Sequence, residues 1–440
     1  MNPLLLVFCL ILFGLQLGLS RKWAFLPLLI AACHTPYTPF MMGLTVTRVV
    51  LMAGLVRAGT KGWFSWNPRN PLDFLMAAFA SIALFATVGH EWEAYNPLIV
   101  RLRLVVDVCG TYLYARAYLN ERETLDRFAA GLALVMLPFA IFMFVEKQSG
   151  INPYRLIGAE NVLSLVRDGK IRAQGPFGTP ILSGTVGASS IPFFLPLWRT
   201  RRGLAAVGLG ASVLVMLTSA SSGPISTAGI GLAAVAFWYW RSYVKALSIL
   251  IVVTLVVLHL VKDRPVWYLM ALMDFVGGST GWHRAYLIDM AVQHWDEWWL
   301  LGSDHTRHWM PYGLAAVPEH CDLTNYYIHL GVTSGLPLAL CLLMIQWKSF
   351  KLLSNGLRQT AGTPDEFWYW CLGSAFFAHG VTFLSISYFD QMYVFFWVLV
   401  GGMTGFLKVE DRVADEDMEA EVMERHRDSY WSPPKPRLDS

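Results

Sequence analysis

The sequence predicts an all-α polytopic integral membrane protein with about 12–13 transmembrane helices and a large periplasmic loop that contains an interfacial helix. Of its 440 residues, 55% are hydrophobic and only 15% are charged, whereas soluble proteins carry about 25% charged residues. Apolar runs recur from the N-terminus to Leu407. These observations exclude a soluble enzyme, a nucleic-acid-binding protein and a secreted disulfide scaffold.

Each predicted span is an apolar run close to the length of about 20 residues that crosses a bilayer. The second and third runs are short, which leaves the number of N-terminal spans open. In chain order the predicted spans are residues 3–20, 23–35, 40–57, 72–90, 98–118, 125–146, 178–198, 203–220, 224–240, 244–262, 325–346, 366–387 and 391–408.

The orientation follows from Lys and Arg, which concentrate in short cytoplasmic loops. Basic clusters at 199–202, 241–245 and 348–358 are placed inside. By alternation the connections 90–97 and 387–391, which contain no Lys or Arg, lie outside. The N-terminus is then predicted outside and the C-terminus inside.

Residues 1–408 form the predicted membrane domain, and 409–440 form a cytoplasmic, acidic, partly disordered tail. Two long loops, 147–177 and 263–324, face outward, and long non-repetitive loops are usually functional. The larger loop contains WHRAYLIDMAVQHWDEWWLLG, which has apolar residues at helical spacing and many tryptophans. This pattern predicts a helix lying at the membrane interface.

Each external loop carries an arginine suited to a phosphate or pyrophosphate. Arg172 lies in IRAQGPFGTPILSG, directly before a predicted span, and a guanidinium can hold such a group through two parallel hydrogen bonds. Arg284 has no carboxylate three or four residues away, because Asp289 is five residues on, so no local ion pair competes for it. The alternative partner of either arginine is a lipid headgroup or water.

The second loop closes with PEHCDLTNYYIHLGVTSGLPL, which runs into the next span. A histidine or carboxylate at this position can take a proton from a hydroxyl, so His320, Asp322 and Asn325 are candidate catalytic residues. Helix N-capping is the alternative role for Asp322, Thr324 and Asn325.

The span 98–118 carries Arg101, Arg103 and Asp107, and charge inside a bilayer usually faces a pocket or a partner. Arg101 and Arg103 are therefore candidate substrate-binding residues. Two alternatives stay open, because Arg101 can snorkel to the external surface and Arg103 can pair with Asp107 one turn later.

Six of the eleven histidines lie between residues 283 and 329, and His305 and His308 form an H-x-x-H pair. This spacing alone is a weak metal signal, and no metal site is predicted. The tryptophans of the same loop suit either the faces of sugar rings or an interfacial aromatic belt.

The order of these motifs resembles that of the O-antigen ligase and O-antigen polymerase family of bacterial membrane glycosyltransferases. An R-x-x-G-x-F-x-x-P segment precedes a span, and a serine-rich turn at 218–226 follows the next one. A large external loop then opens on the helix of Arg284. It ends in H-x-D-x-T-N at 320–325, with G-L-P-L behind it. The match covers roughly residues 125–408.

This resemblance implies an inverting, metal-independent enzyme of the bacterial inner membrane that needs no cofactor. Its donor is a glycan linked to undecaprenyl pyrophosphate, used on the periplasmic face. The acceptor is lipid A–core oligosaccharide for ligases and another lipid-linked glycan chain for polymerases. The absence of a very large loop insertion favours a polymerase.

Two sets of residues match the family's site. Arg172 and Arg284 match the two loop arginines that hold the pyrophosphate. The family's His-Asn pair falls on Thr324 and Asn325, so the histidine is displaced to His320, and the base is either His320 or Asp322. The family's Ser-Arg turn is present as 221–222, a pair of serines without the arginine.

Two rival interpretations come from other classes of protein. A transporter or flippase for polyprenyl-linked oligosaccharides should show internal repeats or broken helices near the bilayer midplane. An inactive membrane scaffold predicts that Arg172 and Arg284 lie far apart. The enzyme instead requires both arginines to converge on one external site.

Overall fold

The computed structural model of the chain describes residues 2–39, 43–64, 70–92, 96–119, 121–272, 281–311, 313–314 and 317–404. The chain is mostly helical (75%) with few strands, as predicted. The predicted tail at 409–440 lies outside the described residues.

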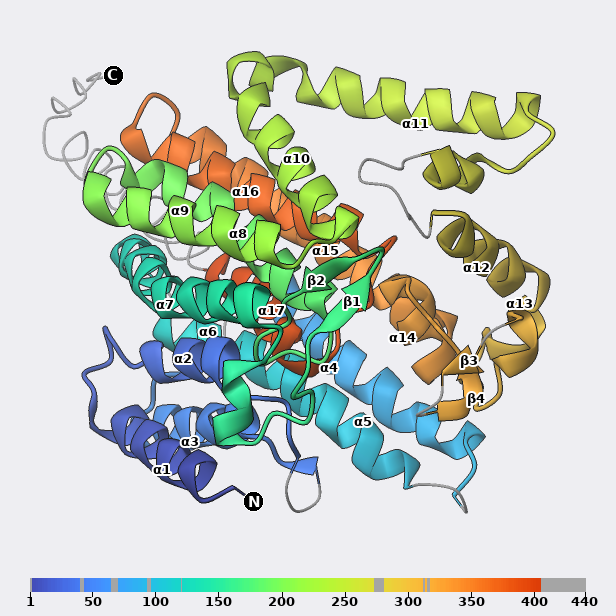
Figure 1. Cartoon of the computed structure of the whole chain (residues 1–440). Helices are drawn as coiled ribbons and strands as arrows, with labels where there is room; N and C mark the ends of the chain where they lie inside the picture. Colours follow the sequence, from blue (N-terminus) through green and yellow to red (C-terminus); the bar gives the residue numbers. More distant parts are fainter. Residues whose placement is uncertain are drawn as a thin grey trace, which may run out of the picture.

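Seventeen helices are described (Figure 1): α1 (Pro3–Gly18), α2 (Leu26–His34), α3 (Val46–Thr60), α4 (Pro71–Phe85), α5 (Pro97–Val105), α6 (Thr111–Tyr118), α7 (Arg122–Ser149), α8 (Pro180–Leu197), α9 (Arg202–Thr218), α10 (Ser222–Ala236), α11 (Val244–Val261), α12 (Gly281–Gln293), α13 (Trp295–Trp298), α14 (Tyr326–Ser334), α15 (Leu336–Gln359), α16 (Pro364–Thr382) and α17 (Tyr393–Gly402). Short 3₁₀ or π turns supplement them: η2 (Ala86–Gly89), η3 (Val106–Gly110), η4 (Pro153–Ile157), η5 (Phe237–Tyr243), η6 (Val266–Leu272), η7 (Arg307–Trp309) and η8 (Asp390–Met392).

Several helices begin with the same local signal, an asparagine followed by proline. Asn2, Asn70 and Asn96 cap α1, α4 and α5, and in each case the next residue is proline. The asparagine side chain accepts a backbone N–H of the first turn, and proline is tolerated there because its missing N–H would have no helical partner.

Two antiparallel hairpins are the departure from an all-α fold, and both lie in the predicted external loops. Strands β1 (Leu165–Arg167) and β2 (Lys170–Arg172) pair in the first loop, and β3 (Gly313–Leu314) and β4 (Val317–Cys321) pair in the second. The first hairpin turns through Asp168 and Gly169, whose φ angles of 50° and 71° are both left-handed. Asp-Gly is the preferred pair for such a two-residue turn.

Five stretches are long and apolar enough to cross a membrane, judged by length and composition: Pro71–Gly89, Arg122–Ser149, Pro180–Leu197, Ser222–Val261 and Leu336–Gln359. Helices α1 and α9 are apolar but shorter. The other predicted spans fall on helices that are shorter or less apolar, so the count of about 12–13 spans stays a prediction.

The predicted span 325–346 is wrong in its boundaries. Gly335, with φ 87° and ψ 162°, separates α14 from α15, and α15 then continues to Gln359. The basic cluster at 348–358 therefore lies on a helix instead of in a loop. The predicted turn after residue 240 is present as a kink in η5, where Trp240 has non-helical angles.

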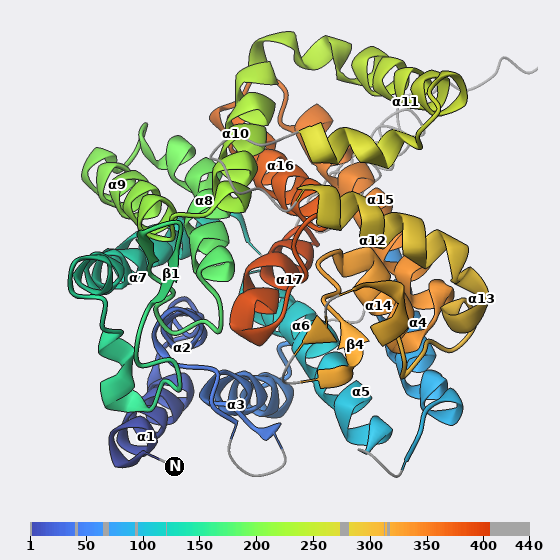
Figure 2. The same cartoon turned by 45° about the vertical axis from the view of Figure 1, so that its right-hand side comes forward.

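The main hydrophobic core surrounds α17, all of whose residues are buried. Figures 1 and 2 show α17 in the interior of the body, with α8 and α9 on one side of it and α4, α5 and α14 on the other. A second, smaller core joins the external loop to α14 and includes Leu287, Ala291, Trp309, Cys321 and Val332. The predicted loop helix is therefore formed as α12, and it packs its apolar side into this core.

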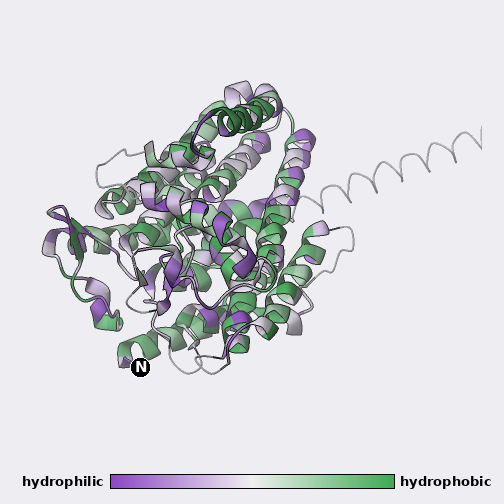
Figure 3. Ribbon diagram, turned by 90° about the vertical axis from the view of Figure 1, so that its right-hand side faces the viewer, coloured by the Kyte–Doolittle hydropathy of each residue, from purple (hydrophilic) through white to green (hydrophobic). Residues whose placement is uncertain are grey.

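Apolar surface remains outside both cores. None of the residues of α11 is buried. This helix runs along one edge of the molecule in Figure 1, and it is coloured mainly as hydrophobic at the top of Figure 3. Helix α1 exposes apolar side chains along its whole length, among them Leu4 and Leu10, which are 58% and 60% accessible. In water such surface is unfavourable, and in a bilayer it is the ordinary outer surface of a helix.

Candidate functional site

Arg172 ends strand β2 in a segment that buried hydrogen bonds fix to its neighbours. Glu146 of α7 is fully buried and accepts the backbone N–H groups of residues 174 and 175, at 3.0 and 2.8 Å. The N–H of Ala173 donates to the carbonyl of Thr218 at the end of α9 (3.1 Å). The backbone around Arg172 is thus held by α7 and α9.

The half-buried Arg172 guanidinium contacts the serine-rich turn. Its Nη2 donates to the Oγ of Ser221 (2.6 Å). Its Nε is buried and has no hydrogen-bond partner among the described residues. Burial lowers the pKa of Arg172, and the charge of Arg167 lowers it further, against a smaller opposite effect of Asp168. A buried donor without an acceptor costs about 1–3 kcal/mol, so this guanidinium is placed to receive an acceptor from a ligand.

The turn that receives Arg172 is also the start of α10. Ala220 has a left-handed φ of 44°, which is unusual for a residue other than glycine. Ser221 is the N-cap of α10, yet its side chain does not cap the helix. It accepts from Arg172 and donates to the carbonyl of Ser219 (2.9 Å). The positive end of the α10 dipole therefore lies beside the Arg172 guanidinium.

Arg284 occupies α12 and has the same features as Arg172. Its Nε is buried and lacks a hydrogen-bond partner among the described residues. Burial lowers the pKa of Arg284, the carboxylate of Asp322 raises it, and the charge of Arg167 lowers it. Asp289 instead accepts hydrogen bonds from Tyr268 (3.4 Å) and Gln293 (3.2 Å). The nearest carboxylate in the sequence thus has other partners, and the absence of a local ion pair at Arg284 stays a prediction.

Arg167 links the two predicted arginines, and sequence reasoning missed it. It ends strand β1 and faces the start of β2 across the Asp-Gly turn. Its charge lowers the pKa of both Arg172 and Arg284. The hairpin thus carries a cation whose charge acts on both predicted arginines.

Asp322 lies just past the end of β4, on the Arg284 side of the loop. The residue is exposed overall, yet enough protein surrounds its carboxyl group that burial raises its pKa, against smaller opposite effects of His283 and Arg284. His283, one residue before Arg284, also contacts the Asp322 carbonyl (3.4 Å). Of the two predicted bases, Asp322 is the one near an arginine of the external loops.

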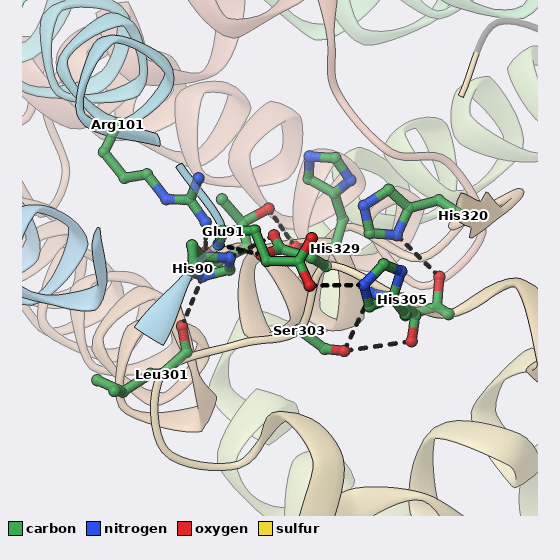
Figure 4. Close-up of polar contacts among 11 residues, drawn as sticks. His90, Glu91, Arg101, Leu301, Ser303, His305, His320 and His329 are labelled. Carbon is green, nitrogen blue, oxygen red and sulfur yellow. Dashed lines mark hydrogen bonds and ion pairs between the residues drawn. The ribbon is translucent and has the colours of Figure 1, made fainter. Parts of the chain in front are cut away.

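His320 belongs to a separate histidine and carboxylate cluster, shown in Figure 4. Its Nδ1 contacts the hydroxyl of the buried Thr306 (3.0 Å). Burial lowers the pKa of His320, and the charged groups next in effect are Asp304, which raises it, and His305, which lowers it. His90 contacts Asp304 (2.5 Å) and the carbonyl of residue 301 (2.9 Å). Through these contacts, the segment 90–97 between two predicted spans is attached to the second external loop.

The H-x-x-H pair does not come together. The ring of His305 contacts Glu91 (3.0 Å), whereas the ring of His308 contacts Glu297 (3.0 Å). The two histidines therefore belong to different groups of side chains.

Asn325 performs the capping role that was the alternative to catalysis. Its Oδ1 accepts the N–H groups of Tyr327 (3.0 Å) and Ile328 (3.2 Å) at the start of α14. Its Nδ2 donates to the carbonyl of Leu384 (3.2 Å). Both ends of this buried side chain are occupied, and it holds the start of α14 against the end of α16. A catalytic role for Asn325 stays a prediction.

Arg101 and Arg103 lie away from the loop arginines. Arg101 is buried, and its Nη2 donates to the carbonyl of Thr333 near the end of α14 (2.6 Å), an arrangement typical of helix C-capping. The Arg103 guanidinium packs on Gly43, where a β-carbon would lie 2.1 Å from Cζ.

Asp107 forms an ion pair with an arginine of another helix, while its predicted pairing with Arg103 stays a prediction. Arg48, a buried residue of α3, binds both carboxylate oxygens of Asp107, at 2.8 and 2.7 Å. A bidentate pair satisfies a buried carboxylate better than a neighbour on the same helix can. The partner was missed because it lies 59 residues away in the chain.

Comparison of the chain with protein-family models finds no match, and comparison with curated proteins finds none either.

Proposed function

We propose that this protein is a polysaccharide polymerase or ligase of the bacterial inner membrane, with its site facing the periplasm. It transfers a glycan from an undecaprenyl-pyrophosphate-linked donor to a sugar hydroxyl of an acceptor. One observation carries the proposal. Arg172 and Arg284, which belong to different external loops, each hold a buried Nε–H that has no acceptor in the described part of the chain, and the charge of Arg167 acts on both.

Two partly buried guanidinium groups, with the charge of Arg167 acting on both, suit a ligand with two or more negative charges. A pyrophosphate offers several acceptor oxygens, and each charge-assisted hydrogen bond to it contributes about 1.5–3 kcal/mol. The start of α10, beside Arg172, adds a helix dipole of the same sign. Without such a ligand, the charge of Arg167 acts unfavourably on Arg172 and on Arg284, and two buried donors have no acceptor among the residues that the structure describes.

The proposed reaction is a single displacement at the anomeric carbon of the donor glycan. The acceptor hydroxyl forms a new C–O bond to that carbon as the C–O bond to pyrophosphate breaks, and the configuration inverts. The proton of the hydroxyl passes to a base of the protein, and undecaprenyl pyrophosphate leaves. Arginines that neutralise the charge growing on the leaving group lower the barrier of this step.

We assign the base to Asp322 in preference to His320. Asp322 lies near Arg284, where the leaving group would bind, and burial raises its pKa above that of an ordinary carboxyl. A raised pKa makes a carboxylate a stronger base. His320 faces the cluster of His90 and Asp304, so its role is to position the β4 strand.

The membrane location is part of the proposal. The five apolar stretches and the exposed apolar surface of α11 and α1 support it. A lipid-linked donor also requires that the site be reached from a bilayer. The transporter alternative would share these features, but the arginine cluster and nearby carboxylate favour chemistry over transport.

The test is complementation of a strain that lacks the gene, with glycan size read on a gel. Arg172→Ala, Arg284→Ala and Asp322→Ala are introduced singly, with Arg155→Ala as the matched control. Arg155 is an exposed arginine of the same external loop, and its loss should change nothing. Membrane levels of every variant are checked by immunoblot.

The glycan pattern distinguishes the alternatives. Accumulation of single repeat units on the carrier supports a polymerase, and long chains that remain on the carrier support a ligase. Wild-type glycans from all three variants would overturn the enzyme proposal and leave the transporter in its place.

A further inference from the structure

A second group of side chains in the external loop has the composition of a metal site. His294, Glu297 and His308 come from the ends of α12 and α13 and from η7, and one ligand atom of each lies within 4.8 Å of the others. His294 Nδ1 is 2.8 Å from Glu297 Oε1, and His308 Nε2 is 3.0 Å from the same oxygen. Two imidazole nitrogens thus point at one carboxylate oxygen.

The surroundings hold these three side chains in place. Trp309 is buried, and its Nε1 donates to the other oxygen of Glu297 (2.9 Å). The ring of His294 stacks on the Trp309 indole, with centroids 5.8 Å apart and planes at 11°. Metal-binding carboxylates are typically oriented by such outer hydrogen bonds. The side chains of His294 and Glu297 keep 32% and 31% of their surface accessible, which leaves a path for an ion.

We propose that His294, Glu297 and His308 bind a zinc ion, with water as the fourth ligand. Two imidazoles and one carboxylate form a known zinc ligand set, and imidazole favours zinc over magnesium or calcium. Zinc lies about 2.0–2.1 Å from such ligands, so tetrahedral ligand atoms are about 3.3 Å apart. The two histidine–carboxylate separations of 2.8 and 3.0 Å would need to open by a few tenths of an ångström, and the two imidazole nitrogens, which lie within 4.8 Å of each other, would take up the same spacing.

The site would be structural, and it stands independently of the proposed glycosyl transfer. The zinc ion would join the α12–α13 segment to η7. Without zinc, these two parts contact each other through Trp309 and the second, smaller core. Thr306, two residues before His308, contacts His320. Zinc would therefore also fix the position of the β3–β4 hairpin, which carries that histidine.

The direct test is zinc content. The purified full chain in detergent is dialysed against zinc chloride, and bound zinc is measured by mass spectrometry beside His308→Ala, Glu297→Gln and the control His305→Ala. His305 shares the H-x-x-H motif but faces Glu91 instead. The wild type and His305→Ala should retain one zinc more per chain than the other two variants. Trp309→Phe, which removes the indole donor together with part of a buried ring, should weaken zinc binding about 10–100-fold.

The second readout is tryptic cleavage after Arg307, whose guanidinium donates to the carbonyls of Met310 (2.7 Å) and Pro311 (3.2 Å). Zinc should slow this cleavage in the wild type and in His305→Ala, and not in His308→Ala. Equal zinc content in all variants would overturn the proposed zinc site, and so would a rate of cleavage in the wild type that is the same with and without zinc. The three side chains would then form a hydrogen-bonded cluster only.

Discussion

Replacing Arg172 by glutamine separates a ligand-binding role from a structural one. Glutamine keeps a polar end but removes the charge and the buried Nε–H. If that group binds pyrophosphate, the variant loses a charge-assisted interaction of about 1.5–3 kcal/mol. Since each 1.4 kcal/mol is a factor of ten, kcat/KM for the donor should fall about 10–150-fold.

The same substitution should lower activity without lowering the stability of the ligand-free protein. In the ligand-free protein the unpaired Nε–H costs about 1–3 kcal/mol, while the bond from Nη2 to Ser221 contributes about 1 kcal/mol. Removing both should leave the free energy of unfolding unchanged or raise it by up to about 2 kcal/mol. A gain in stability with a loss of activity is typical of a binding residue.

The assay uses purified protein in detergent with a limiting concentration of undecaprenyl-pyrophosphate-linked oligosaccharide. Initial rates are compared with thermal unfolding without donor, and Arg155→Gln serves as the control. Activity equal to the wild type would refute the reasoning. A loss of activity with an equal loss of folded protein would refute it as well, since Arg172 would then be structural.

Three further predictions follow from other contacts. Asp322→Asn should lower kcat about 10²–10⁴-fold, whereas His320→Gln should chiefly lower stability; the reverse result in a single-turnover assay would exchange their roles. Gly335→Ala should destabilise the fold by about 2–5 kcal/mol, because a β-carbon would lie 2.1 Å from the Leu300 carbonyl oxygen; Gly362→Ala, with φ 78° but open space, is the control for thermal unfolding. Burial raises the pKa of Asp390 from 3.8 to about 6, partly offset by the Gly178 N–H. The folded state therefore favours the protonated acid, so this group's stabilising contribution is complete below pH 3.8 and is lost as the pH rises through about 6. In Asp390→Asn, the melting temperature should no longer carry the part of its pH dependence between 3.8 and about 6 that Asp390 contributes. A variant whose melting temperature changes with pH as much as that of the wild type would contradict the assignment.

The helical body was predictable because long apolar runs carry a strong local signal. Helices α7, α8 and α9 lie within a few residues of the predicted spans. The break at Gly335 was missed because no Asp, Glu, Lys or Arg interrupts the run 326–346, although the segment Ser-Gly-Leu-Pro at 334–337 marks a turn. The β1–β2 hairpin was missed because its strands have three residues each, too few for alternation to be visible. Its Asp-Gly turn was the available signal.

Some residues of the candidate site could likewise be predicted from the sequence, and others could not. Arg172 and Arg284 could be proposed from the order of the motifs, because each lies in a long loop between apolar runs that the sequence alone shows. Arg167 could not, because its approach to Arg284 depends on how a hairpin meets a helix more than a hundred residues later. The choice between His320 and Asp322 also required the fold. Strand β4 ends at Cys321, so the two side chains meet different neighbours.

The second loop is attached to the helices through main-chain atoms. The N–H of Ser303 donates to the carbonyl of Val332 (2.8 Å), and the N–H of Leu336 donates to the carbonyl of Trp299 (2.8 Å). Main-chain bonds of this kind do not depend on which side chains occupy 299–303, but they require close approach at two positions. A β-carbon on Gly302 would lie 2.3 Å from the Val332 carbonyl oxygen, just as one on Gly335 would meet Leu300. During divergence, a homologue could therefore change almost every side chain of this attachment and still hold the loop in the same place, provided that these two glycines remain.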